Sequence, residues 1–430
     1  MKVLHLAAGA LGRGASRGAL WLHQGLLDQG VESRFLTTDA APDLPGVEPV
    51  LPGPLGQVLL SGLRQLDRLP LRAYAFDRRG TLSPGWIGLP IQSMPGYKEA
   101  DLIHLHWIND GLLDLNSLRW CKKPVVWTVR DLWPTTGLCH YPQGCERQAA
   151  GCGHCPLLPA PAWPWPDPSH RGFRRKQRAI RRSPITFVGI SPWVSEKLRT
   201  SPIMMGQSVH MIWNCIDERQ FRPLAKAEAR RDLKLDPAGG PYVLAEMRSP
   251  ASESWKGFQH VLDILPDLGR AGITLLLFGH VPADLAGFAV DGVHCFGRVE
   301  DDARLRQLYA AADVFICPTL EEAFGKTMAE AMACGTPVLA FRCSAPADLV
   351  EPGLTGELVE PGDSRRLWQG LEQLLPIAPQ MASACADRAL QLFSTGQAAH
   401  AYRQLYGNLL SHSIPEAQNR VPGSSKGQLC

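Results

Sequence analysis

The sequence predicts an α/β protein whose two parallel sheets are each covered by helices. Short apolar runs, rich in β-branched residues, alternate with helical patterns along almost the whole 430-residue chain. Strands that are apolar on both faces are typical of parallel sheets buried between helices. The runs fall into two sets, and a chain of this length is expected to fold as two units. We therefore expect two Rossmann-like domains.

The expected strands divide the chain between residues 210 and 222. Those of the first domain, residues 1–210, are Lys2–Leu6, Ser33–Thr37, Leu102–His106, Val125–Val129 and Thr186–Ile190. Those of the second domain, residues 222–385, are Tyr242–Glu246, Thr274–Gly279, Val293–Phe296, Val314–Cys317 and Pro337–Phe341. Apolar residues at helical spacing predict a closing helix over residues 386–411, and the tail at 413–430 is expected to be disordered.

Composition excludes several classes of protein. A net charge of +3 is too weak to indicate a nucleic-acid partner. No apolar stretch approaches the roughly 20 residues that cross a bilayer, and the N-terminus has no secretory cleavage site. Most of the 12 cysteines stand singly in apolar segments, which favours buried free thiols in a reducing compartment. We expect a cytoplasmic protein that at most touches the inner face of a membrane.

The most informative stretch runs from Pro318 to Phe341 and predicts a strand, a loop, a helix and a further strand. Phe324 and Gly325 stand just before the helix, where the backbone can approach a ligand and free N–H groups attract phosphate. Glu322 in the loop and Glu330 in the helix have carboxylates suited to paired hydroxyl groups. The alternative is an ordinary pair of solvated glutamates.

Glu322 and Glu330, followed by Ala331-Met332-Ala333-Cys334-Gly335-Thr336-Pro337-Val338, resemble the signature of family 4 retaining glycosyltransferases. The resemblance implies a GT-B fold, in which two Rossmann-like domains face a central cleft. It implies a nucleotide-diphosphate-sugar donor, UDP- or GDP-linked, bound by the second domain. Glu330 would hold the ribose and Glu322 the transferred sugar. Gly325-Lys326 departs from the commoner Gly-Leu, which bears on donor choice.

Members of this family also carry two cations that contact the diphosphate. Lys256 matches the lysine well, and Arg248 matches the arginine less closely because six residues, 249–254, stand between Arg248 and Trp255-Lys256. Cations at this place can stabilise the charge that develops on the leaving phosphate. The alternative is that both are exposed solubilising charges. Asp-x-Asp is absent from the chain, so no cofactor is expected for catalysis.

The glycines after the first expected strand belong to the acceptor side in this resemblance. Gly12 and Gly14 begin a dinucleotide-binding pattern, but Arg17 stands at its third glycine position, which weakens an oxidoreductase hypothesis.

His104-Leu-His106-Trp107 is similar to an exopolysaccharide, colanic-acid-type subgroup, as are Trp133-Pro134 and Cys139-His140-Tyr141. His106 is therefore an acceptor-side candidate, although a histidine bonded to the backbone at a strand end fits equally well.

In that subgroup a histidine commonly precedes Asp131, and here the residue is Arg130. A guanidinium stays protonated, so it cannot act as a base and would instead stabilise negative charge in the cleft. Asp131 is expected to orient it through paired hydrogen bonds. The alternative is a purely structural salt bridge of Arg130 with Asp131 or with another surface acid.

Two clusters in the first domain have open interpretations. Within a loop at 139–168 that is rich in cysteine and proline, Cys139, Cys145, Cys152 and Cys155 are compatible with a structural zinc site, with two disulfides or with free thiols. The basic run at 170–182 predicts a helix that faces either an anionic membrane or solvent.

The resemblance implies retaining transfer of a sugar to a saccharide or lipid-linked saccharide in exopolysaccharide or envelope synthesis. A sugar-nucleotide epimerase on the same fold is one alternative. A non-catalytic nucleotide-sugar-binding protein is another, and Arg130 is the residue that keeps it open.

Overall fold

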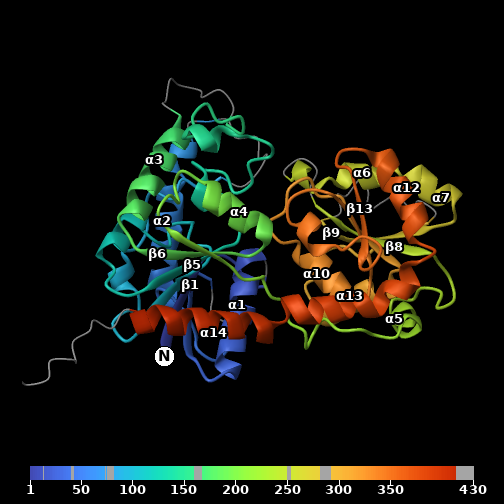
Figure 1. Ribbon diagram of the computed structural model, residues 1–430, viewed down its shortest axis with the longest axis horizontal. Coiled ribbons are helices and arrows are strands. Elements are labelled where there is room, and N and C mark those ends of the chain that lie inside the picture. Colours follow the sequence, from blue (N-terminus) through green and yellow to red (C-terminus); the bar gives the residue numbers. More distant parts are fainter. Residues whose placement is uncertain are drawn as a thin grey trace, which may run out of the picture.

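The structure is a computed structural model, and it describes residues 1–12, 14–39, 43–72, 74, 82–158, 167–248, 253–280 and 292–412. Two parallel sheets form the centres of two domains (Figure 1). The first sheet has the strand order β3-β2-β1-β4-β5-β6-β7, and the second has the order β10-β9-β8-β11-β12-β13. All pairings within them are parallel, as the sequence predicts.

The strands of the first sheet are β1 Lys2–Ala7, β2 Glu32–Thr37, β3 Val47–Pro49, β4 Leu102–Leu105, β5 Val125–Val129, β6 Ile185–Gly189 and β7 Ser208–Met211. Those of the second are β8 Tyr242–Met247, β9 Thr274–Gly279, β10 Val293–Cys295, β11 Val314–Cys317, β12 Val338–Phe341 and β13 Gly356–Val359. The central strands β4, β5 and β6 are buried at every residue, which explains their continuous apolar sequences.

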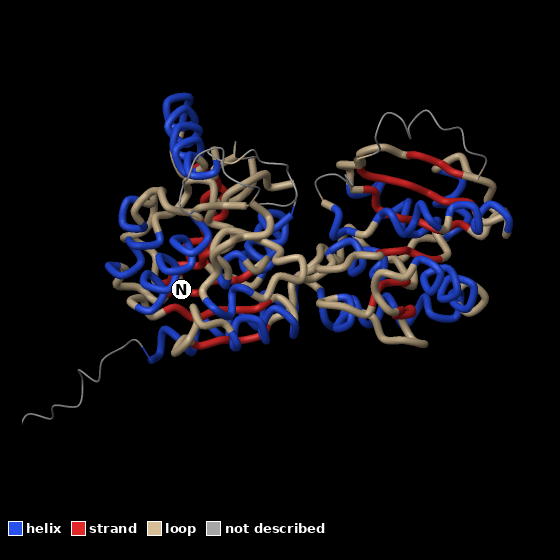
Figure 2. The backbone as a smooth tube through the Cα atoms, turned by 90° about the horizontal axis from the view of Figure 1, so that it is seen from above, coloured by secondary structure: helices blue, strands red, loops and turns tan. Residues whose placement is uncertain are grey.

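Helices cover both sheets (Figure 2). Those of the first domain are α1 Gly14–Asp28, α2 Gly53–Asp67, α3 Pro168–Arg181 and α4 Pro192–Thr200. Those of the second are α5 Lys226–Asp232, α6 Phe258–Asp263, α7 Leu265–Arg270, α9 Asp302–Ala311, α10 Lys326–Ala333, α11 Pro346–Leu349, α12 Ser364–Leu374 and α13 Ala378–Phe393. The last helix, α14 Thr395–His412, returns to the first domain and packs on α1. No helix in the described ranges combines the length and apolar character needed to span a bilayer.

All ten expected strands are confirmed, and three strands that the sequence analysis missed lie at sheet edges. β3 has three residues and ends in a proline, while β7 is mostly exposed. β13 begins at Gly356, where an added Cβ would lie 1.9 Å from the Val338 carbonyl oxygen. Such short strands do not bury enough side chains to give a continuous apolar run.

The single closing helix expected over 386–411 is in fact two helices. Ser394 breaks them because its backbone is extended, with φ −65° and ψ 148°. The segment between the two domains holds this break: Ile216 N–H donates to the Phe393 carbonyl at 2.8 Å, and the Glu218 carboxylate accepts from Thr395 N–H at 2.8 Å. α13 therefore covers the second domain and α14 the first (Figure 1). The expected disordered tail lies outside the described residues.

The strand orders locate the functional edges. The order reverses between β1 and β4 in the first sheet and between β8 and β11 in the second. Ligands of open parallel sheets bind beyond the carboxyl ends of the strands at such a point. Ser191, which follows β6, donates its hydroxyl to the Ala323 carbonyl after β11 at 2.8 Å, so the carboxyl edges of the two sheets meet.

Candidate active site

The carboxyl edge of the second sheet holds an ion pair between two of the predicted site residues. Lys256 ends a short 3-10 turn after β8, and Glu322 lies in the loop after β11. Lys256 Nζ is 2.5 Å from Glu322 Oε2. Gly257 permits this approach, since its φ is +67° and an added Cβ would lie 1.8 Å from the Pro318 carbonyl oxygen. The loops after β8 and β11 are thereby joined at the switch point.

Charge at this edge is arranged around two neighbouring cations. Arg248 Nε is 2.8 Å from Glu246 Oε1. Burial opposes the charge of Lys256, but the Glu322 carboxylate raises the pKa of that lysine above its ordinary value, against a smaller opposing effect of Arg248. Burial alone would raise the pKa of Glu322, but the Lys256 ammonium holds that pKa below its usual range. Glu322 is thus an anion held beside two cations, an arrangement that can also bind phosphate oxygens.

Helix α10 begins beside the same loop. Gly325 is its N-cap residue with φ +83°, and an added Cβ would lie 2.0 Å from Met328 Cε. The N–H groups of the first helical turn have no partners within the helix and attract anions. Phe324, just before, is 2% exposed and packs between Trp213 and Phe393, so it anchors this loop to the interdomain core.

Glu330 is more deeply buried than the sequence suggests, at 1% exposure. Its Oε2 accepts from the Tyr309 hydroxyl at 2.9 Å. Its Oε1 has no hydrogen bond in the described structure, and Lys326 Nζ lies 3.3 Å away from it. Lys326 also lies 5.5 Å from the ring centre of Trp21 in the first domain. The carboxylate therefore keeps one oxygen available beneath a lysine that connects the two domains.

A segment of the first domain, residues 139–158, crosses to this edge, and we call it the cysteine arm. The Tyr141 hydroxyl lies 3.5 Å from Glu322 Oε1, and its ring stacks on Trp255 at 5.7 Å. Gln143 N–H donates to Glu321 Oε2 at 2.6 Å, and burial raises the pKa of Glu321 to about 7. Sequence analysis missed these contacts. The one available signal was the second glutamate directly before Glu322.

The expected pairing of Arg130 with Asp131 is wrong. Both residues stand in the bend that follows β5, and their side chains have separate partners. Arg130 Nη1 donates to Asn214 Oδ1 at 2.6 Å. Asp131 Oδ2 lies 2.7 Å from His140 Nδ1, and its Oδ1 accepts from Trp133 N–H. Arg130 is only 8% exposed and its Nε is unpartnered among the described residues, so burial lowers the pKa of its guanidinium.

Arg130 adjoins a set of buried histidines. His5 Nδ1 is 3.0 Å from His106 Nε2, and His106 Nδ1 is 3.5 Å from Arg130 Nη2. His104 is bonded to the Thr128 and Tyr406 hydroxyls, at 2.7 Å and 2.6 Å. Burial, helped by Arg130, holds the pKa of all three histidines well below 6.5. Both His104 and His106 are therefore held by side-chain bonds, whereas the alternative considered for His106 was a bond to the backbone.

Among the described residues, the ligand atoms of His5, His104 and His106 form a group within 4.8 Å of one another that could hold a metal ion. Both ring nitrogens of His104 are already bonded, and a guanidinium faces His106. A cation would be repelled there, and we interpret the group as a hydrogen-bonded part of the core.

Three glycines of the first domain lie at the start of α1 or just before it, and none of them contacts the Lys256–Glu322 ion pair. Gly14 begins α1 with φ +51°, and Gly12 has no atom within 4 Å of an added Cβ. At Gly18 an added Cβ would lie 2.6 Å from Arg130 Nη1 and 2.9 Å from Asn214 Oδ1. Gly18 thus leaves room for the guanidinium. The acceptor-side role of Gly12, Gly14 and His106 stays a prediction.

Comparison with known proteins identifies the class of enzyme. Residues 244–376, which contain Lys256, Glu322 and Glu330, match the family described as glycosyl transferases group 1. The chain is a glycosyltransferase of the GT-B type. Similar solved structures share its fold: a sucrose-phosphate synthase from Thermosynechococcus elongatus superposes with TM-score 0.66 and 20% identity, covering 96% of this chain and 100% of its own. HepE from Anabaena, in complex with UDP and glucose, gives TM-score 0.61 and 17% identity, with 95% and 100% covered.

Sequence relatives of this glycosyltransferase carry names that differ in the sugar and the acceptor. A D-inositol 3-phosphate glycosyltransferase from Actinosynnema mirum is 25% identical over 383 residues, 84% of this chain and 83% of its own length. A sulfoquinovosyl transferase from Arabidopsis thaliana is 31% identical over 157 residues, 35% of this chain and 30% of its own. The colanic-acid-type subgroup stays a prediction.

No disulfide joins the four cysteines of the cysteine arm in this glycosyltransferase. Burial raises the pKa of Cys139 to about 12 and that of Cys152 to about 11. Their sulfurs do not form a group within 4.8 Å of one another. The alternative of two disulfides is therefore not realised in this part of the structure, and the zinc hypothesis stays open.

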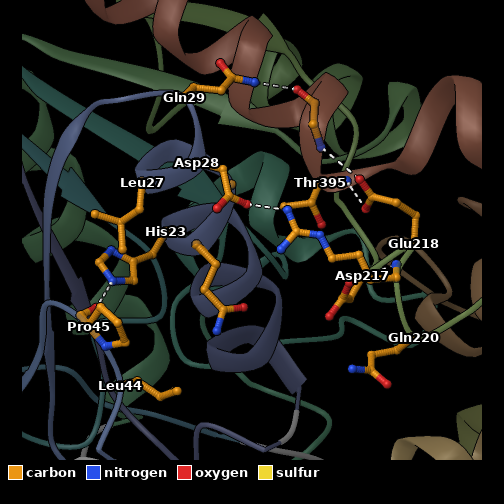
Figure 3. A pocket seen from close by; sticks show the side chains of 14 residues that line it. His23, Leu27, Asp28, Gln29, Leu44, Pro45, Asp217, Glu218, Gln220 and Thr395 are labelled. Carbon is orange, nitrogen blue, oxygen red and sulfur yellow. Dashed lines mark hydrogen bonds and ion pairs between the residues drawn. The ribbon is translucent and has the colours of Figure 1, made fainter.

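A pocket of about 520 Å³ lies away from the predicted site residues (Figure 3). It is lined by the second half of α1, residues 44–45, residues 217–220 and the start of α14. Its charged groups are engaged with one another or with backbone: Arg219 lies 2.7 Å from Asp28, and Glu218 caps α14 (Figure 3). We interpret it as a space behind the segments that connect the domains.

Proposed function

We propose that this glycosyltransferase transfers a sugar from a UDP- or GDP-linked donor to a saccharide or lipid-linked saccharide, with retention of configuration, in polysaccharide synthesis. The observation that carries the proposal is the edge where Arg248, Lys256, Glu322 and the start of α10 meet beside the switch point. Similar GT-B proteins have been solved with UDP-glucose, in HepE, and with ADP, in Arabidopsis thaliana starch synthase IV.

In this proposal the protein binds the donor through charge rather than through a metal ion. Lys256, Arg248 and the first N–H groups of α10 hold the diphosphate and stabilise the charge that grows on it as the glycosidic bond breaks. Glu330 Oε1 accepts from a ribose hydroxyl once Lys326 moves aside. Glu322 contacts the transferred sugar, and the Lys256 ammonium keeps the Glu322 carboxylate ionised.

Retention follows when the acceptor attacks on the face that the diphosphate leaves. The glycosidic carbon–oxygen bond to phosphate breaks, the acceptor oxygen bonds to the sugar, and a phosphate oxygen takes the acceptor proton. No protein nucleophile is needed, which agrees with an engaged Glu322. Arg130 and His106 lie at the opposing edge, where we place the acceptor.

We propose a lipid-linked acceptor in particular, approached from the inner face of a membrane. Helix α2 and the turn after it expose an apolar stripe at helical spacing: Leu55, Val58, Leu59, Leu66 and Leu69. Asp67, the one acidic residue of α2, is buried. Helix α3 exposes arginines at positions 171, 174, 178 and 181 and contains no acid. Together they offer an apolar face and positive charge, which suit an anionic lipid surface.

The membrane part is tested by vesicle flotation. Vesicles containing phosphatidylglycerol should carry the protein, and those of phosphatidylcholine alone should carry much less. Leu55→Ser with Leu59→Ser should abolish flotation, while Leu390→Ser, at an exposed leucine of α13, should not. Equal flotation of the α2 and control variants would reject this surface.

The transfer itself is tested by incubating a panel of nucleotide-sugars with the protein, with and without saccharide and lipid-linked acceptors. We expect acceptor-dependent consumption of one donor, with the product anomer, read by NMR, matching the donor anomer. Consumption without acceptor would favour an epimerase. Binding without any turnover would favour a non-catalytic nucleotide-sugar-binding protein. Inversion would contradict the retaining mechanism.

A further inference from the structure

The cysteine arm contains little regular secondary structure. It has no strand and only one short 3-10 turn, Arg147–Ala150, so little regular hydrogen bonding fixes it. Its backbone is also strained, because three of its residues other than glycine have positive φ: Gln143 at 52°, Cys152 at 58° and His154 at 47°. Strained backbone persists only where the surroundings determine it. Isolated hydrogen bonds, such as that from Gly153 N–H to Ser169 Oγ at 3.0 Å, hold parts of this segment in place of regular structure.

One sulfur of the arm is placed as an acceptor. Gly137 N–H donates to Cys152 Sγ at 3.2 Å. Outer donors of this kind orient metal ligands.

The four sulfurs share one environment. Cys139 interacts electrostatically with Cys152 and Cys155, and Cys145 interacts with the same two. The ammonium of Lys176 in α3 lies next to them: it is 1% exposed, interacts with Cys139 and Cys152, and donates to the Trp133 carbonyl at 2.5 Å.

We propose that Cys139, Cys145, Cys152 and Cys155 bind one structural zinc ion, which fixes the cysteine arm against the donor edge of the active site. Four thiols release four protons on binding, and the resulting tetrathiolate site carries a charge of −2 that Lys176 partly offsets. The ion draws the sulfurs to about 2.3 Å from itself, closer together than the free thiols stand. No open coordination position is left, so the ion has no catalytic role.

The site explains how the arm can hold its contacts with the second domain. Tyr141 and Gln143 lie between Cys139 and Cys145, and they contact Glu322 and Glu321 of the second domain. Fixing the two cysteines on either side fixes both contacts. The inference does not depend on the donor or acceptor, so it can fail while the proposed transfer stands.

The test is metal analysis of the full chain, purified without chelator and without a metal-affinity tag. About one zinc per chain is expected. Cys145→Ser and Cys155→Ser should each lose most of it, while Cys121→Ser and Cys295→Ser, at free thiols elsewhere, should retain it. Zinc retained in the arm variants, or no zinc in any of the proteins, would overturn the proposal.

A second measurement uses the wild-type protein and does not depend on the stability of the variants. An organomercurial titrated into the protein with a chromogenic chelator should release one zinc as four protected thiols react. Four thiols that react at once without releasing zinc would overturn the site. So would an intact mass lower than that of the fully reduced chain by the hydrogens lost to one or two disulfides.

Discussion

In this glycosyltransferase the carboxyl edges of the two sheets differ in how their charged side chains are neutralised. We call the edge of the first sheet the first edge and that of the second sheet the second edge. At the second edge, Lys256 and Glu322 are ionised and paired. At the first edge, Arg130 is a buried cation whose bonded partners are a neutral amide and a histidine, and burial keeps the adjoining histidines neutral. We infer from this difference that the second edge can exchange its ion-pair partners for a charged ligand. The other has a single positive charge that no described acid neutralises.

The largest expected effect is on stability in acid, because the buried histidines of the first edge are neutral in the folded state. His5, His104 and His106 have pKa values well below 6.5 in the folded state and near 6.5 when unfolded. Below that pH the unfolded chain binds more protons, so stability is lost as pH falls. For three such groups together, the free energy of unfolding should fall by about 4 kcal/mol between pH 7.5 and pH 5.5. Urea unfolding across this range measures the loss.

His104→Phe should remove about a third of this change in the free energy of unfolding with pH, although it also breaks two hydrogen bonds. Substitution of the exposed His412 by Phe is the control and should leave the slope unchanged. A stability that is flat between pH 7.5 and 5.5 would mean that the first edge tolerates protonated histidines.

The next effect concerns the second edge, which we call the ionised edge because Lys256 and Glu322 are both charged there. Glu322→Gln removes the anion that pairs with Lys256 and, in our proposal, contacts the transferred sugar. Turnover should fall about 10²–10³-fold, as for other groups that act on developing charge. Glu351→Gln, which breaks a surface pair with Arg388, is the matched control and should keep full activity. Loss of less than about threefold in Glu322→Gln would remove this residue from the mechanism.

A smaller effect is expected at Glu321, where the two domains meet. Its folded pKa of about 7 lies above the unfolded value, so the folded state binds more protons between about pH 4.5 and pH 7, and stability falls as pH rises through that range. Glu321→Gln keeps an acceptor for Gln143 N–H and removes the charge. It should stabilise the protein by about 1–3 kcal/mol at pH 8 and by little at pH 4.5. Equal effects at both pH values would contradict the shifted pKa.

The smallest effect is expected at Arg130. Arg130→Met removes a buried cation that no described acid neutralises, so the fold should tolerate it, while turnover should fall about tenfold if the charge serves the acceptor side. Gly18→Ala should mimic it by displacing the guanidinium. Arg119→Met, at an exposed arginine over Trp120, removes a positive charge far from the edge and is the control. Unchanged turnover in Arg130→Met would make this position structural.

Much of the second domain could be predicted because its site residues are close in sequence. Glu322, Gly325 and Glu330 belong to one strand, loop and helix, and local rules place them correctly. Lys256 follows the neighbouring strand of the same sheet, so its meeting with Glu322 follows from topology.

Contacts between the domains could not be predicted, since they depend on how two separately folded units sit against each other. Tyr141 and Gln143 reach Glu322 and Glu321 from about 180 residues away. The Arg130–Asp131 pairing failed for a related reason. Adjacent charges suggest an ion pair, but Asn214 between the domains and His140 in the cysteine arm offer each side chain a better-placed partner.

The central claim, that the ionised edge binds a nucleotide diphosphate, is tested most directly by calorimetric titration of UDP and GDP. Lys256→Ala and Glu330→Ala should each weaken binding about tenfold to hundredfold, since losing a charged partner costs about 1.5–3 kcal/mol. Lys2→Ala, at an exposed lysine of the first domain, should bind as the wild type does. Unchanged nucleotide affinity in both site variants would contradict the account.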